Sequence, residues 1–126
     1  MIDINKQIEY WIKSAEDDLE AVKYLVDNNK TLQAMFFCHL AVEKTIKAHV
    51  AKQTNDVPPK IHNLKRLAEL AKLNLTDGQK NILNELMVFQ QEGRYPEYYP
   101  EKPSQEFAST IYDETKIILS CLKQML

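Results

Sequence analysis

The stretch that decides the fold is residues 32–53, LQAMFFCHLAVEKTIKAHVAKQ. At 100° per residue its apolar side chains cover most of a helix's circumference, and Gln33, Lys44 and Lys47 form a narrow polar strip. Such a helix is either the centre of a bundle or buries one face in its own chain and another in a partner. We therefore expect an all-helical fold built around this segment, and a homodimer if the chain leaves one face open.

Both flanks of this segment repeat apolar residues at intervals of three to four, which predicts more helices. A helix is expected over residues 6–27, ended by residues 28–30. A proline-containing linker, residues 54–59, separates the central helix from a short helix that begins after Asn63. A further helix is expected to begin at Thr76 and end at Gly93, and a last one to follow residue 104. The helix-capping residues are expected to be Thr31, Asn63, Thr76 with Gln79, and Ser104.

Length and composition fit one compact domain over residues 1–126. The chain is 44% hydrophobic and 27% charged, which predicts an antiparallel four-helix bundle with an additional short helix. The two cysteines, Cys38 and Cys121, lie in amphipathic segments without a CxxC motif, so we expect neither a disulfide framework nor a metal site, and no cofactor. Reduced cysteines and the lack of a long apolar stretch predict a cytoplasmic protein with no membrane segment.

Charge is distributed unevenly along the chain. Residues 31–72 carry seven basic and three acidic side chains, whereas the segments before and after are net acidic. This balance excludes wholesale coating of nucleic acid and leaves room for a local anion site. The basic candidates for phosphate contact are Lys44 and Lys47 on the central helix and His62 after the linker.

Two acidic residues have specific expectations. Glu43 follows His39 by one helical turn, and we expect these two to form a hydrogen-bonded core pair, because one histidine and one glutamate are too few ligands for a metal. Asp18 lies at the edge of the first helix's apolar stripe and can turn into a groove between helices.

Residues 94–103, RYPEYYPEKP, combine one arginine with three tyrosines and three prolines. An arginine there can clamp a phosphate with two hydrogen bonds, and tyrosine rings can stack on bases. Packing at the end of the bundle is the alternative use of the same residues. We take Arg94 as the centre of any ligand site, with Tyr95 and Tyr99 as binding residues.

Four segments together resemble the HEPN (higher eukaryotes and prokaryotes nucleotide-binding) domain. They are residues 15–19 (AEDDL), 37–48 (FCHLAVEKTIKA), 62–64 (HNL) and 94–96 (RYP). The resemblance implies a four- to five-helix bundle, usually a homodimer, often produced beside a minimal nucleotidyltransferase as a toxin–antitoxin pair. Many such domains are metal-independent endoribonucleases with an R-x4-6-H motif.

Arg94 matches the arginine of that motif, but Tyr98, Tyr99 and Pro100 stand where its histidine is expected. We therefore expect a dimeric partner of a minimal nucleotidyltransferase that binds nucleotide or RNA without efficient catalysis, because no imidazole follows Arg94 to transfer protons near neutral pH. One alternative is an active ribonuclease with a variant site of Arg94, Asp18 and Tyr98 or Tyr99, aided by His62. Another is a purely structural dimerisation module.

Overall fold

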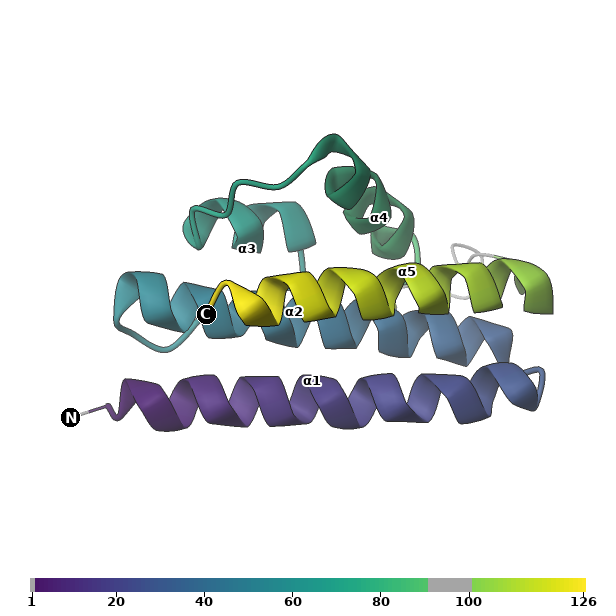
Figure 1. The fold of residues 1–126 in the computed structure, drawn as a ribbon, viewed down its shortest axis with the longest axis horizontal. Helices are drawn as coiled ribbons and strands as arrows, with labels where there is room; N and C mark the ends of the chain where they lie inside the picture. Colours follow the sequence, from purple (N-terminus) through teal and green to yellow (C-terminus); the bar gives the residue numbers. More distant parts are fainter. Residues whose placement is uncertain (1, 91–100) are drawn as a thin grey trace.

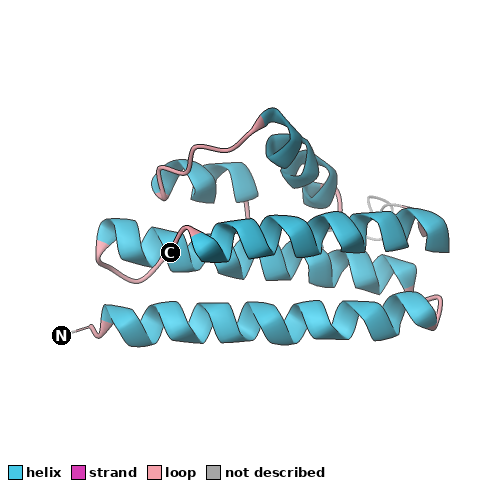
Figure 2. Cartoon of the chain, in the orientation of Figure 1, coloured by secondary structure: helices cyan, strands magenta, loops and turns pink. Residues whose placement is uncertain are grey.

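The computed structural model describes residues 2–90 and 101–126, and these residues form five helices (Figure 1). In chain order they are α1 (Ile4–Asp27), α2 (Thr31–Thr54), α3 (Leu64–Leu70), α4 (Asp77–Met87) and α5 (Gln105–Gln124). Loops and turns make up the rest of the described chain (Figure 2). The expected all-helical bundle is confirmed, with three long helices and two short ones.

Helix α2 is the centre of the bundle and contacts each of the other four helices. Its apolar circumference is buried within its own chain, with α1 on one side and α5, α3 and α4 on the others (Figure 1). Of the two uses that the sequence allowed for this helix, the central position is the one found. The apolar faces of α2 are therefore accounted for without a partner copy. The largest fully buried side chains are those of Met35, Ile46, Leu64, Leu67, Leu83, Leu86, Ile111, Leu122, His39, Val22, Val42 and Val50.

The long helices do not all alternate in direction. Helix α1 runs antiparallel to α2, whereas α5 runs in the same direction as α2 (Figure 1). At their beginnings, the hydroxyl of Thr31 donates to the carbonyl of Pro103 at 2.7 Å. At their ends, Nε2 of His49 lies 2.7 Å from the carbonyl oxygen of Leu122. The short helices α3 and α4 carry the chain back between these two parallel helices.

Three of the four expected helix caps are present. The side chains of Asn63, Thr76 and Ser104 accept hydrogen bonds from the backbone three residues later, and Gln79 completes a capping box with Thr76. The expectation for Thr31 was wrong, because Lys30 is the N-cap residue of α2 and the Thr31 hydroxyl is used by Pro103. Helix α4 ends at Met87, earlier than expected, and Gly93 lies outside the described residues.

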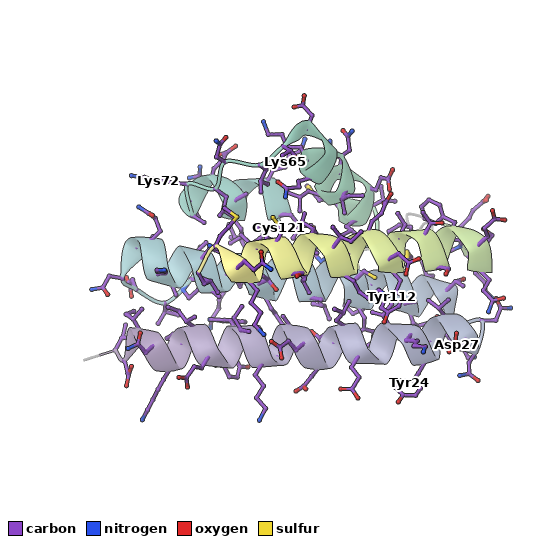
Figure 3. The ribbon with its side chains drawn as sticks, viewed as in Figure 1. Tyr24, Asp27, Lys65, Lys72, Tyr112 and Cys121 are labelled. Carbon is purple, nitrogen blue, oxygen red and sulfur yellow. The ribbon has the colours of Figure 1, made fainter. Side chains whose placement is uncertain are left out.

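The turn between α1 and α2 contains Asn29 with φ of 59°, and α2 ends at Asn55 with φ of 57°. Asparagine tolerates this left-handed conformation better than most residues that carry a Cβ. These two positions let α1 reverse into α2 and let α2 end in the linker that carries His62. The side chains of the long helices fill the spaces between them, while Tyr24 at the end of α1 points to solvent (Figure 3).

Candidate functional site

The candidate site is centred on Glu43, a buried carboxylate in the middle of α2. Its side chain is only 4% exposed. Lys47, one turn further along the helix, places Nζ 3.1 Å from Oε2. His62, from the linker before α3, places Nδ1 3.0 Å from Oε2 and 3.1 Å from Oε1. A buried carboxylate is tolerated only when it is paired, and these two groups supply the pairing.

His62 reaches Glu43 because both sides of it in the chain are held. On one side, Pro58 is buried and the amide of Ile61 donates to the carbonyl of Pro59 at 2.9 Å. On the other side, the Asn63 side chain accepts from the amide of Arg66 at 3.0 Å and begins α3. The imidazole is therefore positioned by the linker on one side and by a helix cap on the other.

His39 lies one turn before Glu43 and is fully buried. Its Nδ1 is 3.6 Å from Oε1 of Glu43, which is an ion-pair distance if the ring is protonated and too long for a hydrogen bond. The two residues are thus close in the core, as expected. The shorter contacts of Glu43 go to His62 and Lys47.

Lys47 is itself nearly buried, with 7% of its side chain exposed. Its Nζ lies 5.3 Å from the centroid of the Trp11 ring of α1, within the range of a cation–π contact. The indole Nε1 of Trp11 donates to Gln7 at 3.3 Å. Lys47 therefore stabilises the packing of α1 on α2 as well as the charge of Glu43.

A second ion pair joins α1 and α2 on the same side of α2. Lys44 Nζ lies 2.6 Å from Oδ2 of Asp18, and the two side chains are 22% and 13% exposed. Within the described residues no donor meets this oxygen at a hydrogen-bonding angle, so the contact is an ion pair by distance. Asp18 does turn into the space between the helices, as its place on the apolar stripe predicted.

A small pocket of about 40 Å³ adjoins the buried carboxylate. It is lined by Phe36, His39, Leu40, Glu43, His62 and Gln90. Gln90 directly precedes the segment that contains Arg94 in the sequence. The half-buried ring of His62, with 31% of its side chain exposed, gives this pocket a polar group that reaches solvent.

The arrangement can supply one oriented imidazole to a ligand. An ionised carboxylate has no proton to donate, so in contact with it Nδ1 of His62 is the donor. Any contact of this ring with a ligand then falls to Nε2. Lys47 offsets the charge of Glu43, which lets the carboxylate remain ionised in a buried position.

The expected site residues divide into three groups. His62 lies on Glu43 at the pocket, whereas Lys44 and Lys47 have their charges engaged by Asp18 and Glu43. Arg94, Tyr95, Tyr98 and Tyr99 lie outside the described residues. The part played by Glu43 in holding His62, and by Trp11 in covering Lys47, was not foreseen. The one-turn spacing of His39, Glu43 and Lys47 could have indicated a buried polar cluster.

Two classes of site were also looked for in the described residues 2–90 and 101–126. These residues contain no group of three or more histidine, cysteine, aspartate or glutamate side chains that could hold a metal ion. Among the same residues, no helix combines the length and apolar character needed to cross a membrane.

The HEPN domain profile matches residues 8–125, nearly the whole chain. The chain belongs to the HEPN family. The crystal structure of an archaeal HEPN homologue has the same fold, with a TM-score of 0.65 and 22% sequence identity over 94% of this chain and 96% of that one. No curated protein matches this chain. The resemblance seen in the sequence is thus confirmed at the level of family and fold.

Proposed function

We propose that this HEPN domain binds a nucleotide or RNA at the pocket beside Glu43, without efficient catalysis, and that it is the homodimeric partner of a minimal nucleotidyltransferase in a toxin–antitoxin-like pair. The observation that carries the binding proposal is the pairing of a half-exposed imidazole, His62, with a buried carboxylate at a pocket. A buried charged cluster costs folding free energy, and such clusters are retained most often where they position a functional group.

The chain continues from this pocket into the segment that carries Arg94, which has the planar, two-pronged donor that suits a phosphate. Arg94, with Tyr95 and Tyr99, is proposed to complete the ligand site. Tyrosine rings offer stacking surface to bases of any sequence, so the proposed site favours single-stranded RNA or a free nucleotide over a duplex.

The test is a titration of labelled single-stranded RNA and of ATP at fixed low salt. Arg94→Lys keeps the charge but loses the planar fork, so it should weaken binding while the fold is unchanged. Arg66→Lys is the matched control, since Arg66 is exposed and pairs only with its helix neighbour Glu69 among the described residues. If neither ligand binds the wild-type protein, the binding proposal fails and the purely structural module is favoured. Equal affinities for wild type and Arg94→Lys remove Arg94 from the site.

An active metal-independent endoribonuclease is the second candidate function. The His62–Glu43 pair favours it, because a carboxylate-held imidazole is a suitable proton-transfer group. Its variant site would combine His62 with Arg94 and Tyr98. Incubating the protein with RNA in EDTA distinguishes the two functions: cleavage that is lost in Arg94→Ala supports the ribonuclease, and intact RNA in a bound complex supports the binding module.

The two proposed partnerships need separate tests. The homodimer rests on the family resemblance, since α2 is covered within its own chain; light scattering at micromolar concentration should give the mass of two copies, and a monomer contradicts it. The nucleotidyltransferase partnership predicts a minimal nucleotidyltransferase gene beside the gene for this chain, with a product that co-elutes with it. Separate elution of the two products contradicts that part of the proposal.

A further inference from the structure

The two nitrogens of the His62 ring have different roles in this structure. Both oxygens of Glu43 lie within 3.1 Å of Nδ1, so this nitrogen carries the hydrogen in any contact with the ionised carboxylate. A neutral ring with its hydrogen on Nδ1 has a lone pair on Nε2. A protonated ring has a second N–H there instead.

The charged groups that face His62 within the described residues come from α2. Glu43 is in direct contact, and Lys47 and His39 lie on the same carboxylate at 3.1 and 3.6 Å. From the end of α4 the pocket receives Gln90, which does not titrate. Glu43 is nearly buried and cannot turn away to solvent, so it keeps Nδ1 occupied whether or not the ring is protonated.

We propose that His62 is a proton-gated phosphate contact. When the ring is protonated, its Nε2–H donates to a phosphate oxygen of the bound ligand while Glu43 holds Nδ1. When the ring loses that proton, the lone pair on Nε2 meets the lone pairs of the phosphate oxygen and the contact is lost. Phosphate-bearing ligands are therefore held more tightly in mild acid than in mild base. This inference rests on the proposed nucleotide or RNA binding and names the group that senses pH within it.

Phosphate is the ligand chemistry that the surroundings favour. The pocket, at about 40 Å³, has room for a single small group and not for a base. The exposed side chains of Lys60 and Lys65 flank His62 in the chain and add positive charge on this side of the molecule. One histidine and one glutamate are too few ligands for a metal ion.

The experiment measures binding of a fluorescent 2′-O-methyl oligouridine at pH 5.5 and pH 8 at one ionic strength. Its phosphodiesters and uracil rings keep their charge over this range, and the methyl groups prevent cleavage at the 2′ oxygens, so pH acts on the protein alone. Wild type is compared with His62→Gln, which keeps a polar side chain that does not titrate. Lys72→Gln, on the α3 side of the molecule (Figure 3), controls for the removal of one surface group. Circular dichroism at both pH values establishes that each variant is folded.

Wild type and Lys72→Gln should bind about three- to fivefold more tightly at pH 5.5 than at pH 8, beyond any difference shared with His62→Gln. His62→Gln should lose that excess and match wild type most closely at pH 8. A pH ratio that is the same in wild type and His62→Gln overturns this inference and leaves the binding proposal standing. Absence of binding at both pH values overturns both. If His62→Gln fails to fold, His62→Asn is measured in its place by the same criterion.

Discussion

Nδ1 of His62 lies 3.0 Å from Oε2 of Glu43, although the two residues are 19 positions apart in the chain. This contact fastens the linker after α2 onto the centre of the bundle. Because Asn63 begins α3 immediately after His62, the same contact fixes where the α3–α4 part of the chain starts. Glu43 thus connects the packing of the long helices to the position of the short ones.

Glu43→Gln should lower the free energy of unfolding by about 3 kcal/mol, because it leaves the nearly buried Lys47 without its charge partner. The change also replaces an acceptor of the His62 hydrogen with an amide that fits it less well. Urea denaturation at neutral pH measures the loss. Glu69→Gln is the matched control, since its pair with Arg66 is exposed and should change stability by under about 0.5 kcal/mol. Equal effects of the two substitutions would contradict the buried-pair interpretation.

The Asp18–Lys44 ion pair should contribute measurably to the packing of α1 on α2. Both side chains are mostly buried and the charged atoms are 2.6 Å apart, so we expect a coupling energy of about 1 kcal/mol from a double-mutant cycle with Asp18→Asn and Lys44→Gln. Glu16 and Lys123 also form a pair, at 2.7 Å, but with side chains 53% and 59% exposed. The same cycle on that pair should give under about 0.5 kcal/mol. A larger coupling at the exposed pair would show that burial does not decide these contributions.

Helix positions were predictable from the sequence because caps and apolar spacing act locally. Asn63, Thr76 and Ser104 begin helices as expected, since each contact spans only three residues. Thr31 failed as a cap because its hydroxyl bonds to Pro103, far along the chain, and no local pattern encodes that partner. The parallel course of α2 and α5 is likewise a tertiary property, set by how α3 and α4 return the chain.

The site was predictable only in part. The spacing of His39, Glu43 and Lys47 placed the three on neighbouring turns, but it could not tell that His62 would supply the shortest contact to the carboxylate. Basic residues were read as free cations from their number and position. Two of them, Lys44 and Lys47, meet acidic partners through helix packing, which a pattern of charges along the chain does not reveal.

The two cysteines should differ sharply in reactivity. Cys38 is fully buried in α2, and burial raises the pKa of its thiol to about 12, with a hydrogen bond from Thr115 acting weakly in the opposite direction. Cys121, on α5, is half-buried and reaches the surface (Figure 3). Because the thiolate is the reactive form, a thiol reagent at pH 8 should label one cysteine per folded chain and two in denaturant. Cys121→Ser should abolish labelling of the folded protein, and rapid labelling of that variant would contradict the burial of Cys38.

His49 should make the fold less stable in acid. Its pKa is lowered below the ordinary 6.5, chiefly by burial between α2 and α5 and also by the charge of Lys52, while the hydrogen bond to the Leu122 carbonyl raises it. The unfolded chain therefore binds a proton near pH 6.5 that the folded chain still refuses, so stability is complete above that pH and is lost as the pH falls below it.

His49→Gln keeps an N–H donor for the Leu122 carbonyl and removes the titration, so it isolates this contribution. Wild type should lose more unfolding free energy than His49→Gln between pH 7.5 and pH 5.5, and the excess should not exceed about 1.4 kcal/mol per pH unit, the limit for one proton. Thermal or urea unfolding at both pH values measures it. The other two histidines titrate in both proteins, so their effects cancel in the comparison. Parallel losses in the two proteins would mean that His49 accepts its proton as readily in the folded chain as in the unfolded one.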